Sequence, residues 1–402
     1  MLFFFVKSWY YVRMTVIAEI GTSHAGSQEK AHKLIDAAVS AGADCVKFQW
    51  VYAEEILHPN TGFVTLPGGS VRLYDRFKEL EVSPDFFADC LSYAHSAGVS
   101  FACSPFGLRS LKELIDIRPD FIKIASPEVN HIPLLKSLSE SDTDIPVILS
   151  SGVSTLGDIE TAVSILTKKD RPLTLLHCIT SYPAPEEEYN VRCVHTLQSV
   201  FGVATGISDH SLDPVLVPAL TVAMGGTMIE KHITLSKKTD GLDDPVALEP
   251  EQFAHMVHAV HQAQAVVTRW NKELFATCGA KDSAEQKLQG VSRQAQEEII
   301  RQLSDQYGTQ KVNAILGTGT KRLAPSEQAN YGRTNRSLHY KTALPKGHIL
   351  NAEDIAVLRT EKVLTPGIHP SLLDTVTGAM LTHDVSAGEG VLLTDVMNKT
   401  QQ

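Results

Sequence analysis

Residues 203–233, VATGISDHSLDPVLVPALTVAMGGTMIEKHI, contain the pattern that decides the fold. Two short runs rich in apolar residues, Val203–Ser208 and Thr227–Ile233, flank an apolar helical stretch at Pro214–Met224. A strand, a helix and a second strand in this order favour parallel pairing of the two strands. Six further runs of this kind precede the unit: Val16–Gly21, Asp44–Gln49, Ser100–Phe106, Phe121–Ser126, Val147–Gly152 and Leu173–Ile179.

Amphipathic helical patterns separate these eight runs, among them Gln28–Ala41, Pro84–His95, Leu156–Thr167 and Val191–Val200. Eight strands that alternate with helices can close into a (β/α)8 barrel, which needs about 250 residues. Residues 14–267 supply that length, and an open doubly wound sheet is the alternative. We predict the α/β class and a TIM barrel, because the runs have similar lengths and no glycine-rich dinucleotide turn follows the first one.

Composition excludes several classes of partner. The 402 residues include 36 Lys plus Arg and 46 Asp plus Glu, a net charge of −10, which argues against nucleic acid and against an anionic membrane surface. The six cysteines are scattered without a CxxC, which fits a reducing compartment, so we expect a cytoplasmic protein. The apolar residues 1–13 are too few to span a bilayer, which takes about 20 residues. We expect a disordered extension there, or a true start at Met14.

Two further units follow the predicted barrel. Residues 268–335 are polar and helix-prone and then loop-like, and we expect a helical linker and a loop. Residues 336–402 are predicted to form a small β-rich domain with weak internal symmetry, since GHIL at 347–350 followed by Asp354 resembles GVLL at 390–393 followed by Asp395. The long connection at 50–82 is typical of a lid or a binding loop.

Two lysines end the second and fourth runs, inside the apolar segments CVKFQ and FIKIAS. A lysine buried in a parallel strand is unfavourable unless its charge is paired. We predict that Lys47 and Lys123 hold a phosphate or carboxylate at the barrel mouth, where strand ends meet. A Schiff-base lysine is a second interpretation, and a structural salt bridge with Glu19, Glu128 or Glu230 is a third.

Two histidines, His210 in ISDH and His232 in IEKH, end the seventh and eighth runs. Neighbouring strands lie about 4.8 Å apart, so both imidazoles can meet at one ion. This pair predicts a divalent metal such as Mn, Fe, Co or Zn. The alternative for each histidine is a hydrogen-bonded residue of the core.

Carboxylates and hydroxyls complete the set of strand-end residues. Glu128, just past the fourth run, is a candidate general acid or base, and Glu19 could orient a histidine or a water. Charge balance for the lysines is the alternative for both. Five hydroxyls could bind phosphate oxygens, with ordinary capping as their alternative: Ser104, Ser126, Ser150, Thr180 and Ser208.

At these positions the sequence resembles the sialic acid synthase family, also described as nonulosonic acid synthases. The matching blocks occur in order: AEIGTSHAG, VKFQ, SPF, KIASPE, ILSSG, LLHCITSYPAP, GISDHS and IEKHITL. The later blocks GTGTK, PSE and RSL, with KGHIL and GIHP, resemble the entry to that family's C-terminal antifreeze-like (SAF, β-clip) domain. The resemblance covers nearly all of residues 14–396.

The resemblance implies a metal-dependent condensation of phosphoenolpyruvate with an N-acyl amino-sugar aldehyde, typically N-acetylmannosamine. The products are a nine-carbon 2-keto-3-deoxy acid and phosphate. It implies that Lys47, Ser104, Lys123, Ser126 and Ser208 bind phosphoenolpyruvate and that His210 and His232 hold the metal, with manganese expected and magnesium or cobalt as alternatives. Glu128 would manage the proton of the water that adds at C2. Glu19 and Gln49 would line the site, with Glu19 among the catalytic residues, and Tyr182 and Asp243 would contact the sugar. Arg336 would reach the N-acyl group, which implies a domain-swapped homodimer.

The sequence departs from the family pattern mainly on the sugar side. Thr180 replaces the usual amide or serine, and Asn335-Arg336-Ser337 replaces a paired Arg-Arg-Ser. The acceptor therefore stays open, and the YPAP and GIHP segments lean toward pseudaminic or legionaminic relatives. A Schiff-base barrel aldolase and a non-catalytic sugar-binding barrel are the alternatives to a synthase.

Overall fold

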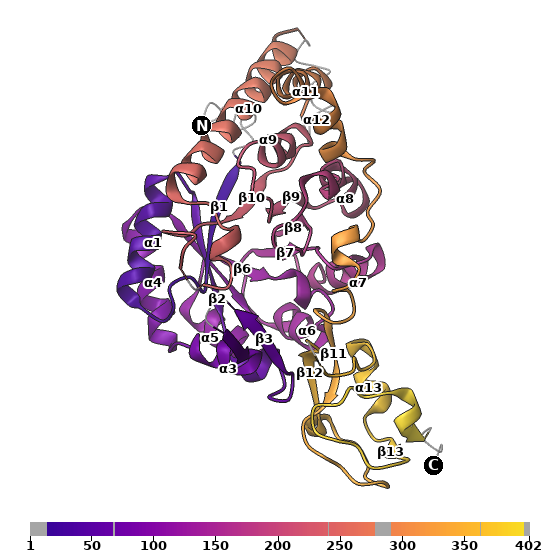
Figure 1. The fold of residues 1–402 in the computed structure, drawn as a ribbon. Helices are drawn as coiled ribbons and strands as arrows, with labels where there is room; N and C mark the ends of the chain where they lie inside the picture. The colour runs from indigo at the N-terminus through magenta and orange to yellow at the C-terminus, as the bar shows by residue number, and fades with distance from the viewer. Residues whose placement is uncertain (1–13, 67–68, 240, 278–290, 362, 398–402) are drawn as a thin grey trace.

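The computed structural model describes residues 14–397 except 67–68, 240, 278–290 and 362. The prediction for residues 1–13, and Cys278, lie outside the described residues. Eight parallel strands close into a barrel in the order β1-β10-β9-β8-β7-β6-β5-β2 (Figure 1). They are β1 (Thr15–Gly21), β2 (Cys45–Trp50), β5 (Ser100–Pro105), β6 (Phe121–Ile124), β7 (Val147–Ser150), β8 (Leu173–Cys178), β9 (Ala204–Asp209) and β10 (Met228–His232). The predicted TIM barrel is confirmed, and the open sheet is excluded.

Helices follow the strands and cover the outside of the barrel (Figure 1). They are α1 (Gln28–Ser40), α4 (Pro84–Ser96), α5 (Leu108–Ile117), α6 (Ile132–Glu140), α7 (Leu156–Leu166), α8 (Cys193–Phe201), α9 (Leu216–Ala223) and α10 (Pro250–Thr277). At the start of α7 the Thr155 hydroxyl accepts from Asp158 N while the Asp158 carboxylate accepts from Thr155 N, a reciprocal capping box. The apolar faces of these helices pack against the outward side chains of the strands, and together they form the main core.

The barrel interior is layered. A small apolar cluster fills its lower part: Ile17, Cys45, Ala102, Ile148, Leu176 and Met228. Because side chains alternate along a strand, the next inward residue lies two positions further on. Those next residues are mostly polar: Glu19, Lys47, Ser104, Ser150, Cys178 and Glu230. The apolar cluster thus forms a floor, and the polar residues lie on it toward the carboxyl ends of the strands.

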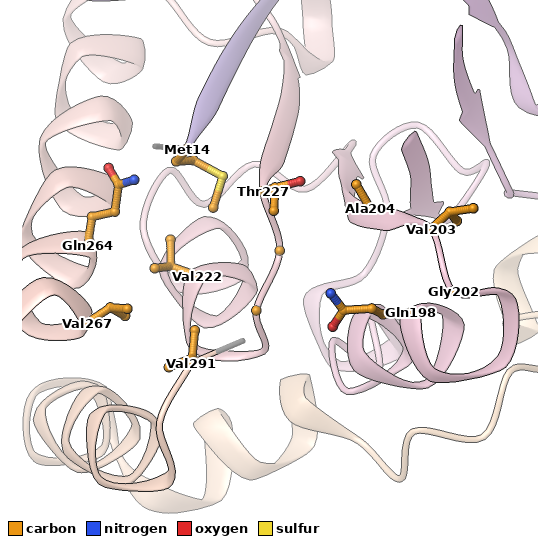
Figure 2. A pocket seen from close by; sticks show the side chains of 12 residues that line it. Met14, Gln198, Gly202, Val203, Ala204, Val222, Thr227, Gln264, Val267 and Val291 are labelled. Carbon is orange, nitrogen blue, oxygen red and sulfur yellow. The ribbon is translucent and has the colours of Figure 1, made fainter. Parts of the chain in front are cut away.

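A cavity lies at the other end of the barrel, near the amino ends of the strands (Figure 2). It has a volume of about 330 Å³ and is lined mainly by apolar residues, including Met14, Val203, Val222 and Val267. These residues lie near the amino ends of β1, β9 and β10 and on helices outside them. The cavity is therefore separated by the apolar floor from the strand ends at which TIM barrels place their chemistry.

The long connection after β2 is folded. It contains α2 (Ala53–Ile56), a hairpin of β3 (Phe63–Leu66) and β4 (Gly69–Arg72), and α3 (Leu73–Glu79). The connection also meets the C-terminal domain, since Leu57 forms a bridge with Arg359. It is thus a structured rim of the barrel mouth.

The segment predicted as a linker extends the helical layer. The helix α10 runs through the expected boundary at residue 267, and α11 (Arg293–Tyr307) and α12 (Thr309–Leu316) follow it. Buried side chains of α11 and α12, such as Ile299 and Ile315, belong to the main core. These two helices are therefore part of the barrel domain rather than a free spacer.

The C-terminal domain is built from short antiparallel pairs: β11 (Arg336–Tyr340) with β12 (Ile355–Arg359), and β13 (Met380–Leu381) with β14 (Val396–Met397). A short helix, α13 (Leu373–Val376), lies between them. The predicted internal repeat is present, because Asp354 accepts from Asn351 N and Asp395 accepts from Leu392 N in equivalent turns. No helix in the described part of the chain is long and apolar enough to cross a membrane.

Gly206 shows how closely the barrel strands approach. A Cβ added there would lie 2.0 Å from the Met228 carbonyl oxygen of the neighbouring strand. We expect Gly206→Ala to lower the free energy of unfolding by about 3 kcal/mol, since overpacking of this kind forces backbone shifts. Urea unfolding checks this. The control Gly157→Ala, on an open helix surface, should leave stability unchanged or raise it, and equal stability of both variants would contradict the expectation.

Candidate active site

Two lysines and two glutamates form a buried charged layer above the apolar floor. Lys47 Nζ lies 2.7 Å from a Glu19 oxygen and 3.9 Å from Glu230, and Lys123 Nζ lies 3.2 Å from Glu230. The Ser208 hydroxyl donates to Glu230 at 2.9 Å. All five residues come from different places in the sequence and converge because their strands are neighbours in one closed barrel.

The charges of this layer are mutually dependent. Burial disfavours the charged form of Glu230, but Lys123 and Lys47 outweigh burial and lower its pKa to about 2. Burial lowers the pKa of Lys123, whereas Glu19 and Glu230 outweigh burial at Lys47 and raise its pKa. The salt-bridge interpretation of the two lysines is therefore confirmed for this structure, and their binding of an anion stays a prediction.

Hydroxyls around this layer have unused hydrogen-bonding capacity. The buried oxygens Ser104 Oγ, Ser150 Oγ and Thr180 Oγ1 have no hydrogen-bond partner among the described residues. Ser126 Oγ accepts from Gly152 N at 2.9 Å, and its hydroxyl also lies within hydrogen-bonding reach of Cys178. Buried polar atoms without partners are unfavourable, and a bound polar ligand would satisfy them.

The two predicted histidines lie above the charged layer. The ring centroids of His210 and His232 are 5.5 Å apart, and the Tyr182 ring stacks on His210 at 4.2 Å. His210 Nδ1 is 2.8 Å from the Ile179 carbonyl oxygen, and His232 Nδ1 is 3.8 Å from an Asp243 oxygen. The Ile179 carbonyl engages Nδ1 of His210, and the Asp243 carboxylate faces Nδ1 of His232, so Nε2 is the atom that each imidazole would offer to a ligand.

The imidazoles of His210 and His232 can be tested as ligands of a divalent cation. Among the described residues no group of three or more His, Cys, Asp and Glu gathers as a complete ligand set. Two imidazoles with an oriented Nε2 would leave the other positions of a cation open to water and substrate oxygens. Burial lowers the pKa of His232 and so favours its neutral ring, whereas at His210 the neighbouring Cys178 outweighs burial and raises the pKa to about 9. A metal at this pair would therefore displace a proton from His210. The residues therefore fit a substrate-binding metal rather than a closed structural site.

Comparison with known proteins agrees with this layout. Residues 34–272 match the model of the NeuB family, and residues 335–397 match that of the SAF domain. The chain belongs to the NeuB family. It is 33% identical over 352 residues to an N,N'-diacetyllegionaminic acid synthase of Campylobacter jejuni, covering 86% of this chain and 90% of the relative. The expected resemblance and the antifreeze-like C-terminal domain are confirmed.

Solved structures extend the comparison. The spore coat polysaccharide biosynthesis protein SpsE of Bacillus subtilis is 27% identical, with a TM-score of 0.74 over 96% of each chain. An N-acetylneuraminic acid synthetase of Leptospira borgpetersenii is 31% identical, with a TM-score of 0.58 over 73% of this chain and 93% of that one. The fold of this NeuB-family chain is thus shared with SpsE over nearly all of its length.

The sugar-side residues of the prediction lie on the same rim. Gln49 donates to Glu19 at 2.8 Å, which fixes that carboxylate between an amide and Lys47. Gly21, with φ of +57°, brings the backbone close to both Gln49 and Asp243. Tyr182 and Asp243 therefore lie against the histidines, and Gln49 and Glu19 lie next to them across Gly21. Their roles toward a substrate stay predictions.

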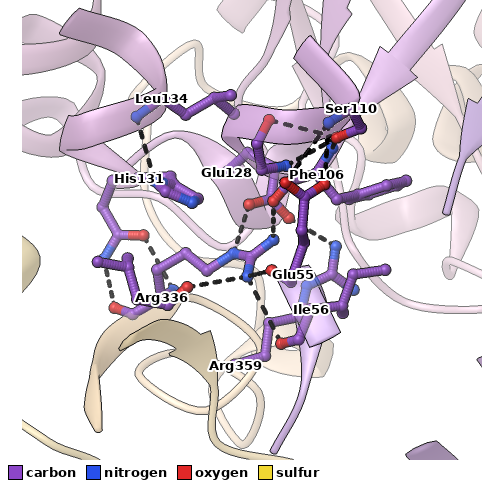
Figure 3. Close-up of polar contacts among 12 residues, drawn as sticks. Glu55, Ile56, Phe106, Ser110, Glu128, His131, Leu134, Arg336 and Arg359 are labelled. Atoms are coloured by element: carbon purple, nitrogen blue, oxygen red, sulfur yellow. Dashed lines mark hydrogen bonds and ion pairs between the residues drawn. The ribbon is translucent and has the colours of Figure 1, made fainter. Parts of the chain in front are cut away.

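Glu128 and Arg336 lie elsewhere on the rim, in the contact between the barrel and the C-terminal domain of the same chain (Figure 3). Glu128 is fully buried and binds Arg336 and, at 2.7 Å, Arg359. The Arg336 guanidinium also donates to the carbonyls of Phe106 and Val357. The two residues were expected to face substrate, and in this chain they bind each other. Their roles toward substrate stay predictions.

Sequence reasoning missed a second buried ion pair directly outside the histidines. Lys231 Nζ lies 2.7 Å from Asp209, donates to the Ser211 carbonyl, and is fully buried with its partner. Asp209 and Lys231 precede His210 and His232, so strand alternation points them outward toward the helices. The sequence pattern that could have predicted this ion pair is that Asp209 and Lys231 each stand directly before a histidine on neighbouring strands. The pair ties together the ends of β9 and β10.

We expect Lys231→Met to lower the free energy of unfolding by about 4 kcal/mol, because it leaves Asp209 as an unpaired buried charge. Urea unfolding measures this. The double variant Lys231→Met/Asp209→Leu should regain part of the loss, since apolar replacements of buried pairs are often tolerated. A single variant as stable as the natural chain would contradict the expectation.

The Glu128 contact predicts a pH dependence. Burial raises the pKa of Glu128, but Arg336 and Arg359 outweigh burial and hold the pKa below its ordinary value of 4.5. A carboxyl whose pKa is lower in the folded chain than in the unfolded chain stabilises the fold when it is ionised. This stabilisation is complete at a pH above the unfolded-state pKa, and it is lost as the pH falls through the folded-state pKa. The free energy of unfolding of the natural chain should therefore exceed that of Glu128→Gln most at neutral pH, and the difference should shrink below pH 4.5. A difference independent of pH would refute this.

Proposed function

We propose that the chain is a nonulosonic acid synthase. It would join C3 of phosphoenolpyruvate to the aldehyde carbon of an N-acyl amino sugar, while water adds at C2 and the C2–O bond to phosphate breaks. The products are a nine-carbon 2-keto-3-deoxy acid and inorganic phosphate. One observation carries the proposal. Two buried lysines, and hydroxyls that have no partner within the described part of the chain, lie beneath two neighbouring histidines.

Phosphoenolpyruvate would bind in the charged layer. Lys47 and Lys123 are held by Glu19 and Glu230, and an anion that enters would share these cations. The hydroxyls of Ser104, Ser126, Ser150, Thr180 and Ser208 would donate to its phosphate and carboxylate oxygens. Charge-assisted hydrogen bonds of this kind are stronger than neutral ones, which offsets the cost of desolvating the ligand.

The aldehyde would lie above this layer, against the histidines. His210 and His232 would hold a divalent cation, with manganese proposed and magnesium or cobalt as alternatives. When bound, such an ion supplies Lewis-acid polarisation of the aldehyde carbonyl. The Tyr182 ring and the Asp243 carboxylate would orient the sugar, while Glu19 and Gln49 line the site. The relatives are named for legionaminic and N-acetylneuraminic acid, and both matching acceptors are candidates.

Glu128 would accept or return the proton of the water that adds at C2, and Arg336 would contact the N-acyl group. In one chain these two side chains bind each other. An exchange of C-terminal domains between two copies would keep that contact but form it between chains. We also propose a domain-swapped homodimer as the working state, which is the arrangement that the family resemblance implies. The mass of the protein in solution, with cross-linking between barrel and C-terminal domain, tests it.

The decisive experiment is phosphate release from phosphoenolpyruvate. Release should require a divalent ion and an acceptor, be abolished by EDTA, and return with Mn²⁺, when N-acetylmannosamine and the legionaminic and pseudaminic precursor sugars are tested. No release with any of them would refute the proposal. Borohydride trapping with pyruvate covers the aldolase alternative, since a covalent adduct on Lys47 or Lys123 would favour that mechanism instead.

The histidine pair gives a sharper prediction. His210→Ala/His232→Ala should lose Mn²⁺ binding, measured by calorimetry, and lower kcat by a factor of about 10³, in the range seen when electrostatic groups are removed from active sites. The variant should stay folded with a lower melting temperature, because two buried rings are removed and His210 loses its contacts with Ile179 and Tyr182. Retained Mn²⁺ affinity would refute the assignment, and His195→Ala on an outer helix is the matched control.

A further inference from the structure

A segment from beyond the barrel is built into the rim at the ends of β7 and β8. Lys321 Nζ donates to the Ser151 carbonyl at 2.9 Å, and Asn335 Nδ2 donates to the Val153 carbonyl at 2.9 Å. Between these two contacts Glu327 reaches the same loops. The segment 321–335 therefore holds two strand-end loops that belong to the barrel.

The Glu327 carboxylate is the centre of this contact. It is completely buried, and one oxygen accepts from both Val153 N and Thr180 N, each at 2.7 Å. The other oxygen accepts from Ala324 N at 3.0 Å. One carboxylate thus joins loops from two neighbouring strands. A buried carboxylate that accepts several N–H bonds is a strong and geometrically specific contact.

The loop that Glu327 holds is strained. Val153 is buried and has φ of +42°, a conformation that a β-branched residue rarely adopts. Its N–H is bound by Glu327 and its carbonyl by Asn335. Strained residues of this kind persist only where the surroundings determine them, and they cluster at functional sites.

The strained turn brings together the hydroxyls expected to bind substrate. Gly152, immediately before Val153, donates to Ser126 Oγ at 2.9 Å, and a Cβ there would lie 2.1 Å from Thr180 Oγ1. Thr180 is itself fixed through its N–H by Glu327. Ser126, Ser150 and Thr180 come from three successive strands, and the contacts of Gly152 and Glu327 set the spacing between them.

We propose that Glu327 is a positioning residue for the phosphoenolpyruvate site. It acts through the backbone of Val153 and Thr180 to hold the hydroxyls of Ser126, Ser150 and Thr180 at the spacing that the anion requires. This inference rests on the proposed function for the identity of the anion. It also makes the segment after the barrel a necessary part of substrate binding.

The test compares Glu327→Gln with Glu188→Gln in the full-length chain. Ser326 precedes Glu327 on the same turn, and its N–H and hydroxyl both donate to Glu188. Glu188 therefore contacts the segment 321–335 itself, whereas Glu327 contacts the loops after β7 and β8. Glu188→Gln therefore loosens the segment without changing the loop contacts. For each variant we would measure KM for phosphoenolpyruvate, KM for the sugar, kcat, Mn²⁺ affinity and melting temperature.

Glu327→Gln should raise KM for phosphoenolpyruvate about tenfold, as expected when charge-assisted hydrogen bonds are weakened. KM for the sugar and Mn²⁺ affinity should stay unchanged, and Glu188→Gln should resemble the natural chain. A lower melting temperature with an unchanged KM, or equal shifts in both variants, would overturn the inference. If Glu327→Gln does not fold, Asn335→Ala, which frees the other side of Val153, must show the same selective rise. A natural chain that neither binds phosphoenolpyruvate nor releases phosphate would overturn the proposed function as well.

Discussion

Side chains on a strand point alternately to its two faces, so each barrel strand of this chain presents residues to the interior two positions apart. That spacing orders the interior into an apolar floor, a charged layer and a pair of histidines above it. A shift of one residue in a strand such as β1 or β2 would move Glu19 or Lys47 into the helical layer and bring an apolar neighbour into the charged layer. The barrel register therefore fixes both the stability of the interior and the chemistry of its mouth.

The charged layer is stable because opposite charges are interleaved. Glu230 binds both lysines, and Glu19 binds Lys47 together with Gln49. Buried ion pairs contribute little net stability, because desolvation cancels most of their attraction. Their value here is that both lysine side chains are held in place and that Glu19 and Glu230 favour the ionised form of Lys47. The same reasoning applies outside the barrel, where Lys231 and Asp209 fix the strand ends that carry the histidines.

The sequence allows much of this arrangement to be predicted, since it depends on local patterns. The eight runs and the polar residue at the end of each are visible in the letters, and parallel pairing brings them together. The Glu128–Arg336 contact could not be foreseen, because it depends on how two domains with separate cores dock. The role of Glu327 could not be predicted for a similar reason. The PSE motif is visible in the sequence, but the Glu327 carboxylate binds backbone N–H groups of Val153 and Thr180, and no pattern of side chains predicts such contacts. The predicted boundary at residue 267 lies inside α10, which continues to Thr277. The polar residues that follow residue 267 predicted a linker, but polar residues also occupy the exposed face of a helix that packs on the barrel.

The contact between Glu128 and its two arginines has a consequence for the barrel considered without its C-terminal domain. Both arginines belong to that domain, whereas the carboxylate lies on the turn after β6. A chain that ends before residue 336 would leave this anion with neither counter-ion. The stranded carboxylate would take up a proton or draw water and cations into the rim, since an isolated charge is poorly tolerated in a low-dielectric setting. The small domain therefore supplies both counter-ions of this barrel carboxylate, which links the two parts of the chain electrostatically.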